Sequence, residues 1–253
     1  METGALTSYF DVAQLVLYMF WIFFAGLIYY LVRENHREGY PLEKEEGRSS
    51  AVKGWPIPGP KTFKLAHGGE AVVPNAPSTR PLMAEPAHAW AGAPLVPTGA
   101  NPMLDGVGPG SWVERADVPD MDFEGAVKIV PLRVATDFRI SHKDTDPRGL
   151  PVVGDDGETG GTVVDLWVDK AESLFRYIEV ELNGGARRVL LPMNFARIRK
   201  DRVTVKSILG HQFADVPGTK STDQVTQLEE EKIMAYYGAG TLYAEPSRVD
   251  PLV

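Results

Sequence analysis

Seven carboxylates gather in two stretches of the sequence that could together hold and pass on protons. Closely spaced carboxylates disfavour one another's ionised forms, which raises the pKa of some of them toward neutral pH, whereas a nearby cation limits that rise. An acidic face in contact with solvent has the same composition, and the residues alone leave both interpretations open. The carboxylates are Asp117, Asp120, Asp122 and Glu124, then Asp165, Asp169 and Glu172, with Lys128 and Arg176 among them.

Other familiar catalytic and metal-binding patterns are missing from the sequence. It contains no cysteine, which excludes thiolate nucleophiles, disulfides and cysteine-ligated metal sites. No glycine-rich phosphate loop, HExxH motif or GxSxG motif occurs. We therefore expect no catalytic, metal-binding or cofactor-binding residue, and an anchored hydrolase that uses the acidic cluster is an unsupported alternative. The histidines occur singly, at His36, His67, His88, His142 and His211.

The composition limits the class of protein. The 253 residues correspond to one or two domains. With 43% hydrophobic and 24% charged residues the chain is ordinary for a folded protein. The formal net charge of -8 argues against a general nucleic-acid-binding protein, whose surface should be basic.

Residues 12–32 form an uncharged apolar run in which Gln14 is the one strongly polar member. As a helix this run would be about 31 Å long, which matches the roughly 30 Å hydrocarbon core of a bilayer. A cleaved signal peptide is disfavoured, because the residues before the run include Glu2 and no basic residue and because the run is too long. The sequence therefore predicts one transmembrane helix.

Basic residues lie on one side of this predicted helix. None precedes it. The positive-inside rule therefore places residues 1–11 outside the cytoplasm and the large C-terminal part within it. The basic residues that follow the helix are Arg33, Arg37, Lys44, Arg48 and Lys53.

Residues 33–118 are rich in proline and glycine and show no sustained helical or strand periodicity. A linker and a segment that lies extended on the surface of another protein would both have this composition. Large aromatic side chains, which are scarce in solvated linkers, favour the surface-docking segment. These aromatics are Trp55, Phe63, Trp90 and Trp112.

Residues 119–253 contain short alternating runs that are typical of β-strands. Alternation within one run places Val164, Leu166 and Val168 on the same face. The sequence NGG at 183–185 predicts a hairpin. Short strands with tight turns predict a small antiparallel barrel. The candidate strands are residues 128–135, 161–169, 176–182, 187–193 and 202–208.

One helix is expected after these strands. The sequence TQLE at 226–229 has the spacing of a capping box, and Gly238 suits the position after a helix end. We expect the helix to run through Tyr237 and to pack on the barrel through Leu228 and Ile233. The predicted architecture is a single N-terminal transmembrane helix and a mainly-β cytoplasmic domain with one C-terminal helix.

Nine stretches, in order along the chain, resemble one family, the H subunit of the photosynthetic reaction centre of purple bacteria. They run from the predicted membrane span nearly to the C-terminus, and REGYPLE and DPRGLPVV are the most specific. The stretches are FWIFFAGLIYYL (20–31), REGYPLE (37–43), PKTFKLAHGG (60–69), DGVGPGSW (105–112), DPRGLPVV (146–153), VDLWVD (164–169), LLPMNF (190–195), LEEEK (228–232) and AYYGAGTLYA (235–244).

This resemblance implies a non-catalytic subunit with a PRC-type barrel that caps the L and M subunits, shields the quinone sites and conducts protons from the cytoplasm to the secondary quinone. L and M would hold the bacteriochlorophylls, bacteriopheophytins, quinones and non-haem iron, and this chain would bind none of them directly. It would lie in the photosynthetic intracytoplasmic (inner) membrane, with a periplasmic N-terminus. Membrane lipids are expected partners, and a cytochrome subunit and the light-harvesting antenna stay open as further ones.

The resemblance also carries over proton-transfer roles to residues in matching positions. Glu172 and Arg176, which follow VDLWVD, resemble the family's groups nearest the quinone pocket. Asp169 and Lys128 resemble their neighbours. The alternative is a membrane-tethered PRC-barrel adaptor or scaffold that has no redox partner.

The proton entrance is where this sequence departs from some members of the family. Asp122 resembles an acidic residue at that entrance, but two surface histidines that follow it in those members are Glu124 and Ala126 here. No imidazole pair is therefore present at these positions. We expect Glu124 to replace it together with Asp122, or the entrance to lie elsewhere.

Overall fold

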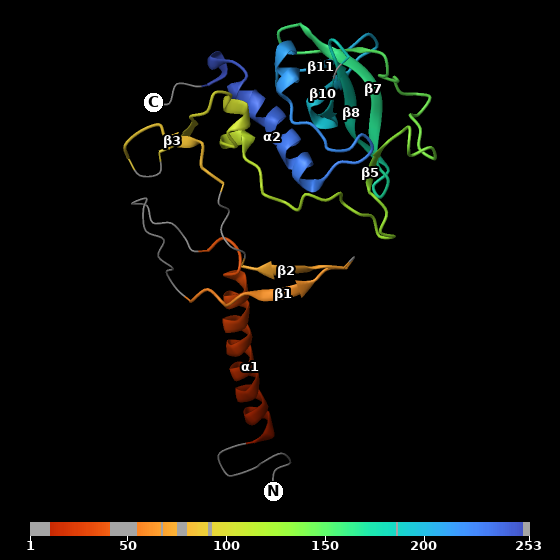
Figure 1. Ribbon diagram of the computed structural model, residues 1–253. Coiled ribbons are helices and arrows are strands. Elements are labelled where there is room, and N and C mark those ends of the chain that lie inside the picture. The colour runs from red at the N-terminus through yellow and green to blue at the C-terminus, as the bar shows by residue number, and fades with distance from the viewer. Residues whose placement is uncertain are drawn as a thin grey trace. The chain divides into compact units, whose positions relative to one another are not determined.

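The computed structural model describes residues 11–40, 55–66, 68–74, 80–90, 93–185 and 187–249. The chain divides into two compact units, and each has a β-sheet of its own (Figure 1). The first unit comprises Met1–Ser78 with Trp90–Gly92, and the second comprises Thr79–Ala89 with Ala93–Val253.

The first unit begins with α1, Val12–Asn35. The Asp11 carboxylate caps this helix by accepting a hydrogen bond from the Gln14 backbone N–H at 2.7 Å. None of its residues is buried, and its length and composition suffice to cross a membrane. The expected apolar helix is therefore present, and it continues beyond residue 32 to Asn35.

A short hairpin follows α1 within the first unit. Strands β1 (Lys61–Lys64) and β2 (Glu70–Val73) pair antiparallel. Arg37 binds the carboxylate of Glu34 through Nε at 2.9 Å and donates from Nη1 to the Val73 carbonyl at 3.1 Å. The sequence indicated no strand here, because strands of four residues are too short to produce a recognisable alternation.

At least three of the four aromatics expected to dock on another protein contact their own unit, and one of them is Phe63, whose ring centroid lies 5.2 Å from Lys61 Nζ. In the first unit the Trp55 ring meets that of Tyr29 edge to face, with 4.8 Å between centroids. In the second unit Trp112 lies between Arg80 and Lys232, whose cationic groups are 3.8 and 4.9 Å from its ring centroid. Cation–π contacts therefore hold Trp112 against the domain that carries it.

Four short elements precede the main sheet of the second unit. Two of them, β3 and β4, pair antiparallel. The sequence did not predict β3 and β4, because strands of three residues, like the four-residue strands β1 and β2, are too short to produce a recognisable alternation. The elements are β3 (Ala84–Pro86), β4 (Leu95–Pro97), the 3₁₀ turn η1 (Pro102–Leu104) and the 3₁₀ turn η2 (Gly108–Gly110).

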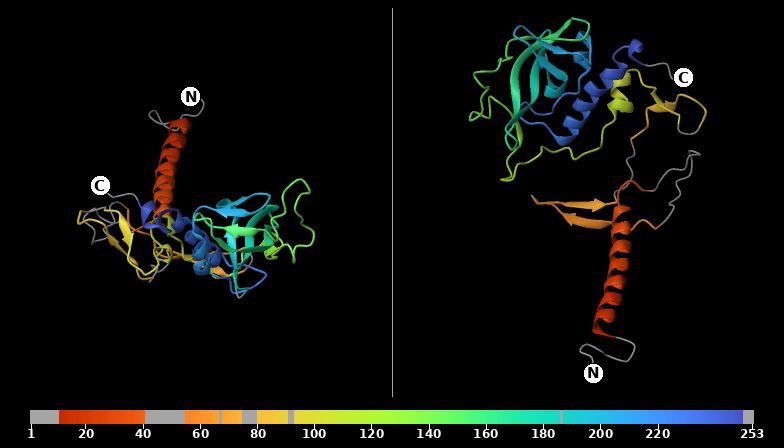
Figure 2. Two further views of the ribbon diagram at one scale, coloured as in Figure 1. Left: turned by 90° about the horizontal axis from the view of Figure 1, so that it is seen from above. Right: turned by 180° about the vertical axis from the view of Figure 1, so that it is seen from behind.

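The main sheet has the strand order β10–β11–β6–β7–β8–β9, with β5 paired to β7, and it curls into a partial barrel (Figure 2). This confirms the predicted mainly-β domain. The pair β11–β6 is parallel and the other pairs are antiparallel. The strands are β5 (Ile129–Pro131), β6 (Pro151–Val153), β7 (Thr159–Asp169), β8 (Leu174–Leu182), β9 (Arg188–Pro192), β10 (Ala196–Ile198) and β11 (Val203–Val205).

The pairing of β7 with β8 is irregular, whereas β8 joins β9 through a tight turn. The predicted hairpin between β8 and β9 is present, with Gly184 and Gly185 both at positive φ. The register of β7 shifts between Val163 and Asp165 and again between Trp167 and Val168. Strict alternation along this strand was therefore wrong, because each bulge changes the face on which the following side chains lie. Val163 and Trp167 are both 1% exposed and belong to the core.

Helix α2 (Gln227–Tyr243) packs against η1, η2 and β9. The predicted capping box is confirmed, since Thr226 Oγ1 accepts from the Glu229 N–H and Glu229 accepts from the Thr226 N–H. The expected end at Gly238 was wrong. A Cβ at Gly238 would lie 2.6 Å from the Pro109 carbonyl oxygen, so this glycine permits close packing within the helix.

The core lies between α2 and the inner face of the sheet. Its largest fully buried side chains come from both sides, and Ile233 on α2 is among them, as expected. The remaining short elements are the 3₁₀ turns η3 (Met193–Phe195), η4 (Gly210–Asp215) and η5 (Pro246–Arg248). The largest fully buried side chains include Trp167, Tyr236, Tyr237, Phe213, Leu166, Ile178, Leu191, Ile208 and Ile233.

Candidate functional site

The ends of three strands bring four of the predicted site residues together. Asp169 ends β7 and pairs with Ile129 of β5, so Lys128, which directly precedes β5, lies beside it. The turn from β7 to β8 carries Glu172, and Arg176 lies near the start of β8. Strand pairing thus positions Lys128, Asp169, Glu172 and Arg176 as one network, named here the inner cluster.

Asp169 is the centre of the inner cluster. Its side chain has no exposure to solvent. Oδ2 lies 3.5 Å from Lys128 Nζ and 3.3 Å from Arg176 Nε. Oδ1 accepts hydrogen bonds from the backbone N–H groups of Ala171 and Glu172, both at 3.0 Å. Two cations and two N–H donors therefore compensate the buried charge.

Glu172 occupies the outer side of the cluster, where 49% of its side chain is exposed. Its carboxylate oxygens lie 3.7 Å from Lys128 Nζ and 3.3 Å from Arg176 Nη2. Because Glu172 is half exposed and also contacts the cations beside Asp169, it can exchange protons with water on one side and with the inner cluster on the other.

Lys128 also contacts Asp120, with 3.6 Å between Nζ and Oδ2. Desolvation by itself would lower the pKa of Lys128, but the charges of Asp169, Asp120 and Glu172 outweigh it and raise the pKa above its ordinary value. Lys128 therefore keeps its positive charge at neutral pH.

Asp122 organises the exposed loop that precedes β5. Its Oδ1 accepts from the backbone N–H groups of Ala126 and Glu124 at 2.8 and 3.0 Å, and its Oδ2 lies 3.7 Å from Lys170 Nζ. The N–H of Ala126, together with that of Glu124 and the charge of Lys170, holds the pKa of Asp122 below its ordinary value. The carboxylate expected at the entrance thus stabilises a turn and stays ionised near neutral pH.

Asp122 connects to the inner cluster through the backbone. The residue it contacts, Lys170, follows Asp169 and donates its N–H to the Lys128 carbonyl at 3.0 Å. Glu124, in contrast, is exposed. Its backbone N–H donates to Asp122, and its carboxylate forms no hydrogen bond or ion pair with the described residues.

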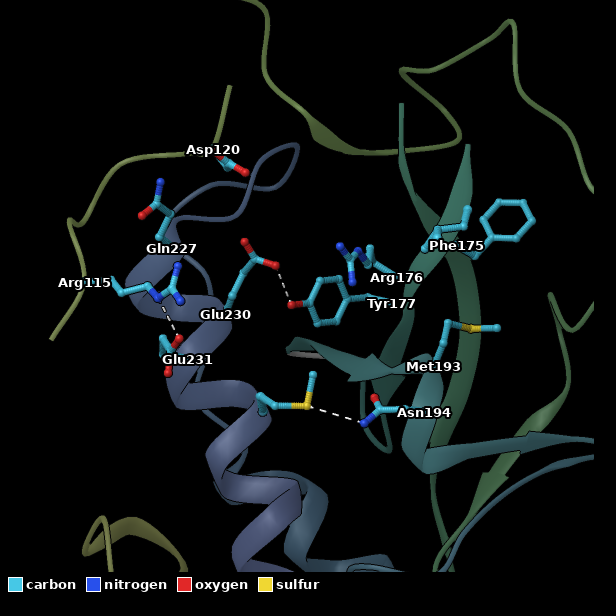
Figure 3. Close-up of a pocket in the computed structure, with 12 residues that line it drawn as sticks. Arg115, Asp120, Phe175, Arg176, Tyr177, Met193, Asn194, Gln227, Glu230 and Glu231 are labelled. Carbon is cyan, nitrogen blue, oxygen red and sulfur yellow. Dashed lines mark hydrogen bonds and ion pairs between the residues drawn. The ribbon is translucent and has the colours of Figure 1, made fainter. Parts of the chain in front are cut away.

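A pocket of about 600 Å³ adjoins the inner cluster, with Arg176 and Asp120 on its wall. Figure 3 shows Glu230 of α2 and Tyr177 of β8 pointing toward one another across it. The Tyr177 hydroxyl donates to Glu230 Oε2 at 2.7 Å. Burial raises the pKa of Glu230, and burial followed by the charge of Glu230 raises that of Tyr177.

The sequence did not single out Glu230 or Tyr177. A signal for Glu230 was present, since Ile233 and Tyr237 lie three and seven residues beyond it and therefore share its face of the helix. Both of those residues are fully buried. The partner of Glu230 depends on how the sheet curls against α2, which no local pattern records.

A second network buries two further carboxylates. Asp165 and Glu179 are 6% and 4% exposed. Arg133 Nη1 lies 3.1 Å from Asp165 Oδ2 and also contacts Glu179, which accepts from the Trp167 indole N–H at 3.0 Å. Arg188 Nη1 pairs with Glu179 at 3.2 Å. Each carboxylate is thus satisfied, and the network stabilises the sheet.

In the described part of the chain, no group of three or more His, Cys, Asp or Glu side chains is placed to hold a metal ion. His67 lies outside the described residues. His36 is buried, and its Nδ1 is 2.9 Å from the Trp55 carbonyl oxygen.

Comparison with known families agrees with this architecture. Residues 4–134, just over half of the chain, match the family described as photosynthetic reaction centre, H-chain N-terminal region. Residues 140–212, which include β6 to β11, match the PRC-barrel domain. The chain therefore belongs to the photosynthetic reaction centre H-chain family.

Proposed function

We propose that this chain caps the L and M subunits of a bacterial reaction centre, shields the quinone sites and conducts protons to the secondary quinone. In this proposal α1 anchors the chain with its N-terminus in the periplasm, and the second unit lies in the cytoplasm. L and M hold the bacteriochlorophylls, bacteriopheophytins, quinones and non-haem iron. The chain contributes no catalytic residue. Membership in the H-chain family supports the association with L and M.

The observation that carries the proton-transfer role is the inner cluster. Residues selected from the sequence by motif position, at 128, 169, 172 and 176, lie in one network of contacts no longer than 3.7 Å. A solvated acidic face would not require a fully buried carboxylate at its centre. Burial of Asp169 between two cations therefore favours the functional interpretation over the acidic-face alternative.

The chemistry of quinone reduction explains why such a network is needed. Reduction by two electrons requires two protons, and a quinone beneath a protein cap cannot take them directly from bulk water. Glu172 can collect a proton from solvent, and the cations Lys128 and Arg176 stabilise the carboxylate that remains after the proton is passed on.

We place the entrance of this path at Asp122, together with Glu124. The Asp122 carboxylate contacts Lys170, the neighbour of Asp169, which provides a short structural connection to the inner cluster. Ionised carboxylates at the surface attract protons from the cytoplasm.

Substitution of Glu172 by glutamine tests the proposal. Glu172→Gln should slow the second electron transfer to the quinone by roughly 10- to 100-fold while L, M and pigment still copurify with the chain. Glu181→Gln is a matched control, because Glu181 lies on β8, is 37% exposed and pairs with Arg188 at 3.3 Å. If Glu172→Gln leaves the rate of the second electron transfer unchanged, Glu172 is part of a solvated acidic surface and not of a proton path.

A tethered PRC-barrel adaptor without a redox partner, the alternative function, predicts that the purified chain carries no pigment. The complex extracted in detergent should show near-infrared bacteriochlorophyll absorption if the chain caps a reaction centre. A chain purified intact and free of pigment from photosynthetically grown cells would support the adaptor.

A further inference from the structure

The pocket beside the inner cluster has a mixed lining that suits a side chain with a long stem and a charged end. Apolar groups of Leu174, Met193 and Met234 form part of the wall, and carboxylates and amides form the rest. Its volume of about 600 Å³ admits more than one side chain. Arginine and lysine bury their alkyl stems against apolar surface while their charged ends find polar partners.

Glu230 forms no ion pair within the described part of the chain, although the charges of Arg176 and Lys128 reach it from beyond ion-pair distance. It is partly buried, its Oε2 accepts from Tyr177, and no ion pair recorded for the described residues includes it. A buried carboxylate without a cation is unfavourable, whereas one that faces a cation at an interface contributes to binding.

The cations that approach this pocket are already engaged. Arg115 Nε binds Glu231 at 2.7 Å, and Arg176 binds Asp169 and Glu172 of the inner cluster. Lys128 pairs with Asp120 at 3.6 Å, so among the carboxylates on the described pocket wall it is Glu230 that is left for a cation from a partner (Figure 3).

We infer that this pocket receives an arginine side chain from the L or M subunit, which pairs with Glu230 when the complex assembles. The inference rests on the proposed capping function, and it identifies where the cap is held. An arginine suits the site better than a lysine, because its planar guanidinium can bind Glu230 and reach the amide oxygens of Gln227 and Asn194 on the pocket wall.

Rebinding of the full-length chain to reaction centre core from which it has been removed tests the inference. Glu230→Gln keeps an acceptor for the Tyr177 hydroxyl but removes the charge, so its Kd for the core should rise by at least about tenfold. Glu181→Gln is the control, because Glu181 lies outside this pocket and pairs with Arg188 at 3.3 Å. Its Kd should change by less than about twofold.

The outcomes separate this inference from the proposed function. Wild-type and Glu230→Gln chains that bind the core equally well would overturn the inference and leave the cap intact. Equal weakening by Glu230→Gln and Glu181→Gln would also overturn it, because the effect would then be one of overall charge. A wild-type chain that neither binds the core nor copurifies with pigment would refute the proposed function itself.

Cysteine labelling gives a readout that does not require a change at Glu230. The chain has no cysteine, so Met234→Cys creates a unique thiol at the pocket, where Met234 is 38% exposed. Its reaction with a maleimide, followed by mass spectrometry, should be at least about tenfold slower in the assembled complex than in the free chain. Equal rates would overturn the inference. Protection by phosphatidylglycerol–phosphatidylethanolamine vesicles without core would assign the pocket to lipid and overturn it as well.

Discussion

Lys128 Nζ lies 3.5 Å from Oδ2 of Asp169, a carboxylate with no exposure to solvent. Removal of one partner from a buried ion pair leaves the other charge insufficiently compensated, although Arg176 and two backbone N–H groups would still contact Asp169. Lys128→Met should therefore lower the free energy of unfolding by about 1–3 kcal/mol.

Urea denaturation of the full-length chain in detergent would measure this loss. Lys200→Met is the control, because Lys200 is exposed, and it should change the free energy of unfolding by less than about 0.5 kcal/mol. Equal stabilities of the two variants would show that Lys128 is not required to compensate Asp169.

The stability of the free chain should depend on pH through Glu230. The folded state raises the pKa of this carboxyl, so over the window between its ordinary and raised values the folded state holds more protons than the unfolded state. Stability is therefore lost as the pH rises through that window. Glu230→Gln removes this loss, so the variant should melt roughly 1–3 °C higher than wild type above the window and equally below it.

Thermal melts monitored by circular dichroism from pH 4 to pH 8 would check this prediction. Tyr177→Phe removes the hydroxyl that Glu230 accepts from, and it should preserve the direction of the pH dependence. A wild-type chain that becomes more stable than Glu230→Gln as the pH rises would contradict the assigned direction of the shift.

The residues of the inner cluster could be predicted because they match positions in or near motifs, such as VDLWVD, that resemble those of the H-subunit family. The sequence did not show that β5 pairs with β7, which is what brings Lys128 beside Asp169. Four of the six selected residues lie in the inner cluster. The sequence could not show that Asp122 folds its own loop, because that depends on two local N–H contacts.

The pocket escaped prediction for a different reason. Tyr177 and Glu230 are far apart in sequence, and they meet because α2 packs against the sheet, an arrangement that no local sequence pattern shows. Strand β6, three residues long, was also missed, and its parallel pairing with β11 joins β10 and β11 to the rest of the sheet. Long-range packing decides both features.

The two carboxylates of the loop before β5 should contribute unequally to proton delivery. Asp122 contacts Lys170, whereas the exposed Glu124 carboxylate extends into solvent. Asp122→Asn should slow the second electron transfer about threefold or more, increasingly as the pH rises and protons become scarce. Glu124→Gln should have a smaller effect in the same direction.

Flash-induced kinetics of the intact complex between pH 6 and pH 10 would measure both effects. Asp137→Asn, at an exposed aspartate outside this loop, is the control and should follow wild type. If Glu124→Gln follows wild type across the whole range, Glu124 has no part in the entrance. If Asp122→Asn also follows it, the entrance lies elsewhere.

Gly238 should be required for the packing of α2. A Cβ there would lie 2.6 Å from the Pro109 carbonyl oxygen, a backbone atom that cannot rotate away. Alanine normally stabilises the interior of a helix relative to glycine by about 1 kcal/mol. Here the clash should outweigh that gain, so Gly238→Ala should lower the free energy of unfolding by about 1–3 kcal/mol. Thr241→Ala, at an exposed position of α2, is the control for helix propensity. If Gly238→Ala proved as stable as wild type in urea denaturation, η2 would have to be able to move away from α2.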